Sequence, residues 1–417
     1  MARASIVEMA AIHVRSYDFA AGLHVPRNAP VDFSRNELLT AIVSVGKSSA
    51  DQLTAPHRIL QSWREIVWRI ALLDMSITHR GSEWCRSDAY EELDPSEKVG
   101  VSYMLGMTAA SVLCTRFLHM PFLMHLDVYT RPEYGVPRYT VSSRWGAAAR
   151  RALNRPSRRG AVLSQVFGGI YPAGADAATQ ERLWSFIELL AGKTRPDLFG
   201  LETSSGYAAR YVIVEAKGRS GSLTAKDNED CVHSRMQSTA KLARPHGPAM
   251  LQALTKDRVA VPGGNPVPVG RHLATFSHFR PDGLWCFSWK DPEEEPLSGQ
   301  ERTNAPPGRL IADFYSNLLA LGMVERARGH EDANENAEVT LAECPAKFII
   351  PGTGLRVGVQ FHPEVHAWLC KAFSRRDLPP HELLNDMPEL LHRLEGSGEI
   401  GPKTRFGING VRIAQSG

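Results

Sequence analysis

The chain has 417 residues, of which 43% are hydrophobic and 22% are charged, and its formal net charge at pH 7 is +3. This composition excludes a mainly disordered, collagenous or membrane-embedded chain, and the length predicts two or three domains. Because the net charge is small, any affinity for nucleic acid has to come from local clusters of cationic side chains.

The cysteine pattern and the N-terminus predict a cytoplasmic protein. The cysteines are scattered and form no CxxC pair, which argues against structural zinc and against a disulfide framework and favours a reducing compartment. Glu8 lies where a signal peptide would have its apolar core. The uncharged stretch 99–114 is short for a bilayer span and carries hydroxyl residues, so it predicts a buried helix and no membrane partner. Arginine greatly outnumbers lysine, which favours a GC-rich bacterial genome.

The N-terminal part of the chain, residues 1–130, is expected to form a mostly helical region. An apolar stripe with helical spacing predicts a helix over residues 58–74, and a second helix is predicted over residues 99–118. Residues 131–160 are polar, rich in arginine and interrupted by proline, which is typical of a linker or an exposed basic arm.

The middle of the chain, residues 161–303, alternates between helical and strand patterns, which predicts an α/β domain with a mixed sheet. Turn residues separate the strands of each predicted hairpin. The predicted helices are 176–191 and 228–242, and the predicted strands are 195–201, 211–216, 272–279 and 284–289. A proline-rich break then opens a C-terminal α/β region, residues 304–417, with a helix at 309–326 and a strand at 357–361.

Two acids and a lysine in the first hairpin carry the strongest chemical signal. Asp197 lies in one predicted strand, and Glu215 and Lys217 end the other, in the sequence Val-Ile-Val-Glu-Ala-Lys-Gly. In an antiparallel hairpin the positions of paired residues have a constant sum, and 197 and 215 average to 206, which is a glycine in the turn. We therefore expect the two carboxylates to be cross-strand neighbours, about 4.5–5.5 Å apart at Cβ. Two like charges so placed favour a bridging divalent cation with oxygen ligands. Lys217, two residues after Glu215, projects from the same face.

These residues resemble the PD-(D/E)xK nuclease superfamily, matched here as Pro196-Asp197 and Glu215-Ala216-Lys217. The resemblance covers roughly residues 175–300 and implies a restriction-endonuclease-like mixed sheet flanked by helices. It also implies Mg²⁺- or Mn²⁺-dependent hydrolysis of phosphodiester bonds, of DNA rather than RNA, in bacterial defence or DNA processing. Asp197, Glu215 and the Ala216 carbonyl would hold the metal, and Lys217 would assist the nucleophilic water.

The resemblance suggests further site residues on neighbouring helices. A glutamate from the preceding helix is frequent in the family, and Glu181 and Glu188 are the candidates; Gln237 lies on the predicted following helix. Only six residues separate Leu190 from Asp197, so the family's usual first strand is missing or displaced.

A basic segment precedes the predicted nuclease-like domain. Residues 131–159 contain eight arginines and a single acid, Glu133, and aromatic residues are interleaved with the arginines. Arginine with aromatic side chains is typical of nucleic-acid contacts, and the alternative is an ordinary exposed arm. The candidate contact residues are Arg138, Arg144, Trp145, Arg150, Arg151, Arg155, Arg158 and Arg159.

Other interpretations stay open from the sequence. The hairpin can be a solvated surface element, or the fold can bind nucleic acid or a partner without cleaving it. The segment around His362 resembles the His–Glu segment of class I glutamine amidotransferases, but Cys286, the nearest nucleophile, reads as strand interior rather than a tight strand-to-helix turn. His362 and His366 have zinc-ligand spacing without a clear third ligand. Strandedness, sequence preference, the mode of cleavage and the oligomeric state do not follow from the sequence.

Overall fold

The fold is taken from a computed structural model of the chain. It describes residues 9–17, 19, 25–45, 56–125, 197–203, 210–219, 267–281, 283–290, 302–303, 307–324, 344–350, 356–374, 380–401 and 404–416. Among these residues the chain forms a mixed α/β structure, which confirms the predicted class.

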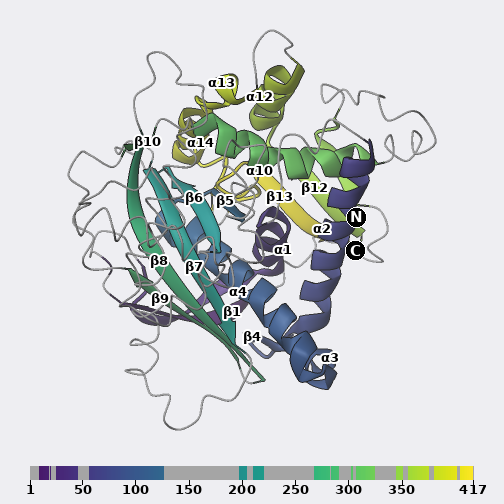
Figure 1. Cartoon of the computed structure of the whole chain (residues 1–417), viewed down its shortest axis with the longest axis vertical. Coiled ribbons are helices and arrows are strands. Elements are labelled where there is room, and N and C mark those ends of the chain that lie inside the picture. The colour runs from purple at the N-terminus through teal and green to yellow at the C-terminus, as the bar shows by residue number, and fades with distance from the viewer. Residues whose placement is uncertain are drawn as a thin grey trace, which may run out of the picture.

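A large curled sheet dominates the molecule (Figure 1). Eight of its strands follow the order β3-β4-β1-β9-β8-β7-β6-β5, while β2 pairs with β1 and β10 with β8. The strands are β1 (Met9–Tyr17), β2 (Asn28–Ser34), β3 (Ile77–Arg80), β4 (Glu83–Arg86), β5 (Phe122–His125), β6 (Leu198–Glu202), β7 (Arg210–Arg219), β8 (Val267–Arg280), β9 (Gly283–Lys290) and β10 (Arg302–Thr303).

The centre of the sheet contains both predicted hairpins. Strands β5, β6 and β7 are antiparallel neighbours, and β8 then lies parallel to β7. Strand β9 returns antiparallel to β8, with Arg280 paired to Gly283 across a two-residue loop, which confirms the second predicted hairpin. On its other side β9 pairs in parallel with β1, so the N-terminal strand completes the centre of the sheet.

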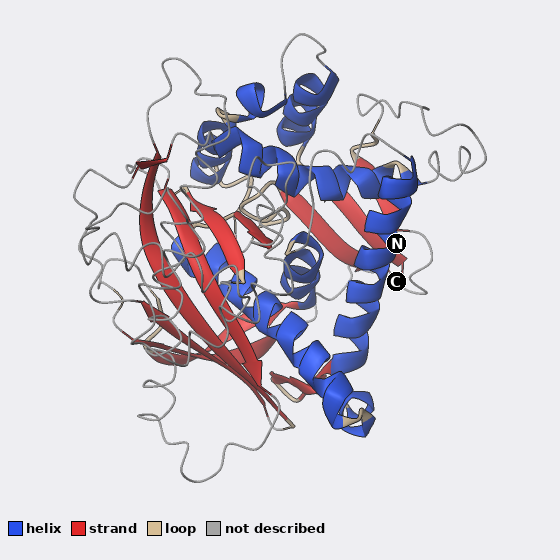
Figure 2. Ribbon diagram, in the orientation of Figure 1, coloured by secondary structure: helices blue, strands red, loops and turns tan. Residues whose placement is uncertain are grey.

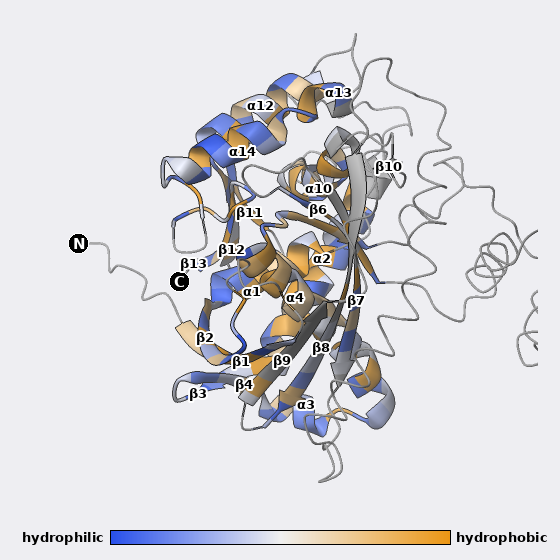
Figure 3. Cartoon of the chain, turned by 90° about the vertical axis from the view of Figure 1, so that its left-hand side faces the viewer, coloured by the Kyte–Doolittle hydropathy of each residue, from blue (hydrophilic) through white to orange (hydrophobic). Residues whose placement is uncertain are grey.

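Helices cover one side of this sheet, as Figure 2 shows for the blue ribbons. They are α1 (Arg35–Ser44), α2 (Pro56–Ser76), α3 (Asp88–Glu92), α4 (Pro95–Leu118) and α10 (Pro307–Gly322). Helices α2, α4 and α10 contain the predicted helices 58–74 and 99–118 and most of 309–326. Apolar residues gather where α1, α2 and α4 meet, whereas α14 is largely hydrophilic on its outer side (Figure 3).

A smaller C-terminal unit packs beside these helices. It consists of the antiparallel sheet β11-β12-β13 and three short helices. Their bounds are β11 (Lys347–Ile350), β12 (Arg356–Phe361), β13 (Val411–Ser416), α12 (Pro363–Ser374), α13 (Pro380–Leu384) and α14 (Met387–Gly396). Strand β12 contains the predicted strand 357–361, and α12 starts at Pro363, the N1 position that suits proline.

Helix α4 is the central helix of the core. Asp94 and Glu97 form a capping box at its start, and His119 ends it in the left-handed conformation with φ of 49°. By length and composition α4 is apolar enough to cross a membrane, but 78% of its most apolar window is buried inside the structure. Its packing against β7 and β8 accounts for that apolar character, as expected from the sequence.

Helix α4 crosses β7 at two glycines. A Cβ atom on Gly218 would lie 1.7 Å from the Ser102 carbonyl oxygen, and one on Gly106 would lie 2.6 Å from the Gly218 nitrogen. Since real Cβ atoms do not approach backbone so closely, only glycine fits at these positions. The crossing therefore fixes the position of the end of β7 relative to α4.

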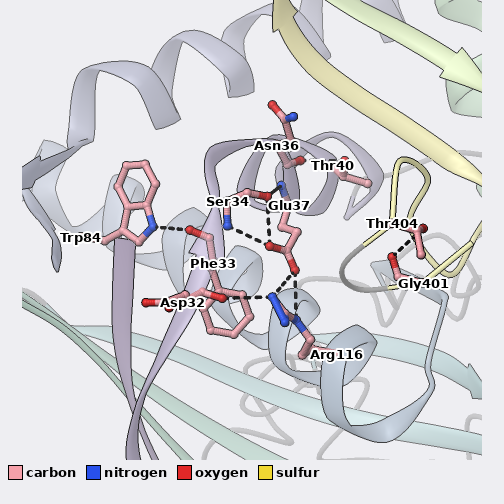
Figure 4. A network of polar contacts seen from close by, with 10 residues as sticks. All are labelled: Asp32, Phe33, Ser34, Asn36, Glu37, Thr40, Trp84, Arg116, Gly401 and Thr404. Atoms are coloured by element: carbon pink, nitrogen blue, oxygen red, sulfur yellow. Dashed lines mark hydrogen bonds and ion pairs between the residues drawn. The ribbon is translucent and has the colours of Figure 1, made fainter. Parts of the chain in front are cut away.

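A polar network fixes the start of α1 against α4 (Figure 4). Ser34 and Glu37 form a capping box, and Arg116 from α4 donates its Nε–H to Glu37 at 3.1 Å and a second N–H to the Asp32 carbonyl at 3.0 Å. Trp84 donates to the Phe33 carbonyl at 2.9 Å, which ties β4 to the same corner.

The N-terminal part of the chain contains strands in addition to the helices that were predicted for it. Five strands occur between residues 9 and 125, and β1 and β5 belong to the same sheet as the middle of the chain. Strand β1 buries Ala10, Ile12 and Val14, while Met9, His13 and Arg15 on the alternate side are at least partly exposed. The small residues Ala10 and Ala11 weaken the apolar signal of this pattern. Its pairing with β9 joins segments far apart in the sequence, so no local turn marks it.

Candidate functional site

The candidate site lies where β6 begins and β7 approaches its end. Leu198 pairs with Val214, so Asp197 stands opposite Glu215 one step further along the same register. The register expected from the hairpin centre at position 206 is therefore confirmed.

Asp197 is held by the backbone of the neighbouring strand. Asp197 is 6% exposed, and its carboxylate accepts a hydrogen bond from the Ala216 N–H at 2.9 Å. The same oxygen lies 3.4 Å from Lys217 Nζ. The buried carboxylate therefore has a backbone donor and an ammonium as polar partners.

Glu215 and Lys217 form the other half of the site. The Lys217 ammonium pairs with the carboxylate of Glu215 as well as with that of Asp197. Glu215 is 8% exposed, whereas 41% of the Lys217 side chain is exposed. The ammonium thus lies at the boundary with solvent, above two buried carboxylates.

The electrostatics of the site oppose the ionisation of Glu215. Burial and the nearby Asp197 charge raise the pKa of Glu215 to about 7, although Lys217 pulls it in the opposite direction. Burial lowers the pKa of Lys217, but Glu215 and Asp197 outweigh that effect, so its pKa is raised and the amine stays protonated. The site therefore has an excess of negative charge that a further cation would relieve.

The packing behind the site keeps β7 in place. Val212, Val214 and Ala216 alternate with the site residues and are fully buried on the α4 side. The Gly218 crossing with α4 follows directly after Lys217. On the β8 side, the Thr275 hydroxyl donates to the Glu215 carbonyl at 3.5 Å. Glu215 and Lys217 therefore project from a strand that is supported on its other face and at its edge.

The donor set fits a hard divalent cation. Two carboxylates converge at one place, and a strand residue directs its N–H and C=O toward the same edge. Since the Ala216 N–H reaches Asp197, its carbonyl faces the same side as Asp197. Oxygen ligands of this kind suit Mg²⁺ or Mn²⁺. Among the described residues no cluster of three or more acidic, histidine or cysteine side chains has metal-binding geometry. Asp197 and Glu215 are therefore the two described side chains that could bind a metal at this site.

Several predicted residues lie outside the described part of the chain, and their roles stay predictions. They are Glu181, Glu188 and Gln237, together with the basic segment Arg138, Arg144, Trp145, Arg150, Arg151, Arg155, Arg158 and Arg159.

The geometry argues against the amidotransferase interpretation. Cys286 lies inside β9, where it pairs with Ser277 on one side and Val14 on the other, so it is not on a strand-to-helix turn. Glu364, the acid of the resembling segment, is exposed and binds Arg393 at 2.6 Å instead of His362.

The zinc interpretation of the same segment also lacks support among the described residues. His366 contacts the Cys344 carbonyl at 2.8 Å, and His362 lies 3.2 Å from Glu399, so the two imidazoles interact with different groups. They share no metal-binding cluster in the described residues.

Sequence reasoning missed two parts of the site. The helix that supports the site strand is α4, far upstream of the predicted helix 176–191, and the strand next to β6 is β5. One local signal existed, since Gly106 lies inside the apolar segment 99–114 and Gly218 directly follows Lys217. A glycine on each of two apolar elements is typical of close backbone approach.

Comparisons with known proteins give no relative for this chain. No family model matches it, and no curated protein or solved structure matches it either.

Proposed function

We propose that this protein is a metal-dependent nuclease that hydrolyses phosphodiester bonds of nucleic acid, DNA rather than RNA. The observation that carries the proposal is the convergence of Asp197 and Glu215 from two neighbouring strands, with the Lys217 ammonium bridging them at the solvent boundary. A simple structural ion pair would need only one carboxylate beside the Lys217 ammonium. Two buried acids, one with a pKa raised to about 7, leave a negative site beside a cationic side chain.

The order of elements around the site supports the PD-(D/E)xK interpretation. In chain order α4, β5, β6 and β7 correspond to the helix, first strand, Pro-Asp strand and Glu-x-Lys strand that the resemblance implies. Residues 126–196 would then be an insertion between the first two strands. On this assignment the supporting helix is α4, and its Glu97 is engaged in the capping box with Asp94.

The roles of the side chains follow from their positions. Asp197, Glu215 and the Ala216 carbonyl would hold Mg²⁺ or Mn²⁺, which supplies Lewis acidity and lowers the pKa of a bound water. The Ala216 N–H keeps the Asp197 carboxylate oriented. In the reaction the water would lose a proton to solvent and its oxygen would form a bond to phosphorus, while the bond to the leaving oxygen breaks and that oxygen takes up a proton from solvent. Lys217, as the most exposed of the three side chains, offsets the charge that develops on the phosphoryl oxygens.

Cleavage assays with matched variants test the proposal. Labelled single-stranded and double-stranded oligonucleotides are incubated with Mn²⁺ and either wild type, Lys217→Ala or the control Lys98→Ala. The control removes a half-buried lysine of α4 whose ammonium binds the Glu91 carbonyl. Because Lys217 acts on the developing charge, its loss should slow cleavage by about 100-fold or more, while the control cleaves as wild type does. Equal rates for wild type and Lys217→Ala would refute the assignment.

Metal binding is tested without substrate. Mn²⁺ should raise the melting temperature of the wild type, since a ligand that binds the native state stabilises it, and should not raise that of Asp197→Ala with Glu215→Ala. A metal-induced shift without cleavage of any substrate would instead favour a binding protein of the same fold.

A further inference from the structure

One turn of α4 lies directly against the backbone that carries Lys217. A Cβ atom on Gly106 would lie 2.6 Å from the Gly218 nitrogen and 3.1 Å from the carbonyl carbon of Lys217. A Cβ atom on Gly218 would lie 1.7 Å from the Ser102 carbonyl oxygen. Backbone therefore packs on backbone here, with no flexible side chain between the two elements that could absorb a displacement. A shift of this turn of α4 has to move the peptide between Lys217 and Gly218.

Tyr90 of α3 anchors the same turn from its other side. The tyrosine is 0% exposed, and its hydroxyl lies 2.8 Å from the hydroxyl of Ser102, which is also buried. A hydrogen bond between two hydroxyls is stronger in a buried site than in water, so its loss is costly there. The carbonyl of Ser102 meets Gly218, so this one residue contacts both Tyr90 and β7.

Tyr90 is itself held in place by polar contacts. Ser87 caps α3 and accepts a hydrogen bond from the Tyr90 N–H at 3.1 Å. The Ser87 hydroxyl donates to the Met75 carbonyl, which ties this cap to the end of α2. The Arg86 guanidinium lies 5.5 Å from the centre of the Tyr90 ring, within the range of a cation–π interaction. The hydroxyl of Tyr90 therefore has a fixed position from which it can hold another element.

The position of the Lys217 ammonium depends on the backbone of β7. The Lys217 side chain is 41% exposed, whereas Asp197 and Glu215 are buried. Its Nζ bridges the two carboxylates, and its separation of 3.4 Å from the Asp197 oxygen is long for a hydrogen bond. A further backbone shift would lose this contact. A displacement of about 1 Å at a catalytic group can cost about 100-fold in rate.

We propose that Tyr90 is a positioning residue for Lys217. Tyr90 holds the turn of α4 through Ser102, and that turn holds the peptide that follows Lys217, so the ammonium stays between the two carboxylates. The proposal rests on the proposed nuclease function, because the position of Lys217 affects the rate only if its ammonium acts on the phosphoryl group. The effect of Tyr90 on the reaction passes through Lys217 alone.

Steady-state cleavage with Mn²⁺ tests the proposal. Tyr90→Phe removes only the hydroxyl and should lower kcat by about tenfold with KM unchanged, because the ammonium acts in the transition state. Ser102→Ala removes the other half of the hydrogen bond and should have the same effect, and the double variant should be no slower than either single variant. In the Lys217→Ala background, Tyr90→Phe should leave kcat unchanged, since no ammonium remains to be positioned.

Tyr315→Phe is the matched control, because it removes a buried tyrosine hydroxyl elsewhere in the core. Tyr315 is also 0% exposed, and its hydroxyl donates to the Asn409 carbonyl at 2.6 Å. Its ring packs on Phe122 of β5. This variant should lower the melting temperature and keep the kcat of the wild type. The control therefore separates a loss of stability from a loss of position at Lys217.

A spectroscopic readout tests the position of Lys217 without any cleavage. In protein that carries ¹⁵N-labelled lysine, the side-chain ammonium signal that disappears in Lys217→Ala belongs to Lys217. In EDTA this signal should shift in Tyr90→Phe and in Ser102→Ala, because the ammonium moves relative to the two carboxylates. It should stay in place in Tyr315→Phe.

The two readouts distinguish a failure of this proposal from a failure of the nuclease function. A wild-type kcat for Tyr90→Phe with an unmoved Lys217 signal would overturn the proposal, and so would a tenfold effect of Tyr90→Phe that persists in the Lys217→Ala background. Cleavage by the wild type would in both cases keep the nuclease. A shifted Lys217 signal in a protein that cleaves no substrate would refute the nuclease and keep the role of Tyr90 in placing Lys217.

Discussion

Replacing Glu215 by glutamine should stabilise the protein above neutral pH. Burial and Asp197 raise the pKa of Glu215 from its ordinary value of 4.5 to about 7. Between these two values the native state holds a proton that the unfolded state has released, so the free energy of unfolding of the wild type falls as pH rises. A difference of about 2.5 pH units, at about 1.4 kcal/mol per unit, amounts to about 3 kcal/mol.

Glutamine is the neutral match of the protonated acid and does not titrate. The stability of Glu215→Gln relative to wild type should therefore be about constant below pH 4.5, rise between pH 4.5 and 7, and level off above pH 7 at about 3 kcal/mol more than at low pH. Urea unfolding at pH 4.5, 6 and 8 measures the difference. A difference that does not change with pH would refute the reasoning. A saturating concentration of Mn²⁺ should remove the pH dependence, because the metal requires the ionised carboxylate.

Two further predictions concern the elements that position the site. Gly218→Ala should lower the free energy of unfolding by about 3 kcal/mol in urea titrations, because its Cβ would lie 1.7 Å from the Ser102 carbonyl oxygen of α4. The control Gly100→Ala in α4 would have no atom within 4 Å of the new Cβ and should be neutral or slightly stabilising. Equal effects of the two substitutions would contradict the close crossing of α4 and β7. Arg116→Met should cost about 2 kcal/mol, because it leaves the Asp32 carbonyl and Glu37 Oε1 without the guanidinium donor. A double-mutant cycle with Glu37→Gln should show a coupling of about 1 kcal/mol, whereas additive effects would argue against the network in Figure 4.

The helices that were predicted from the sequence share one property. Each begins at a proline. Apolar residues form a stripe of helical period in α2 and an almost uninterrupted run in α4. The two hairpins were predictable for a similar reason, since apolar runs flank turn residues in each. Period and turn chemistry are local properties, so a single sequence contains them.

The missed strands have no such local mark. Strand β5 has four residues, and its neighbour β6 follows only after a long intervening segment. Strand β1 enters the sheet by parallel pairing with β9, a contact between the two halves of the chain. Such pairings depend on which distant surfaces bury each other best, and that is a property of the assembled core rather than of any window of residues.

For the candidate site the division follows the same physics. The sequence by itself determined that Asp197, Glu215 and Lys217 share a face of one hairpin, because strand residues alternate and the turn centre sets the pairing. Only the tertiary structure decided that both acids are buried, that the pKa of Glu215 rises, and that α4 supports the strand from behind. Burial depends on distant segments that cover a residue, and β7 is an interior strand of the sheet only because β8, β9 and β1 follow it in that order.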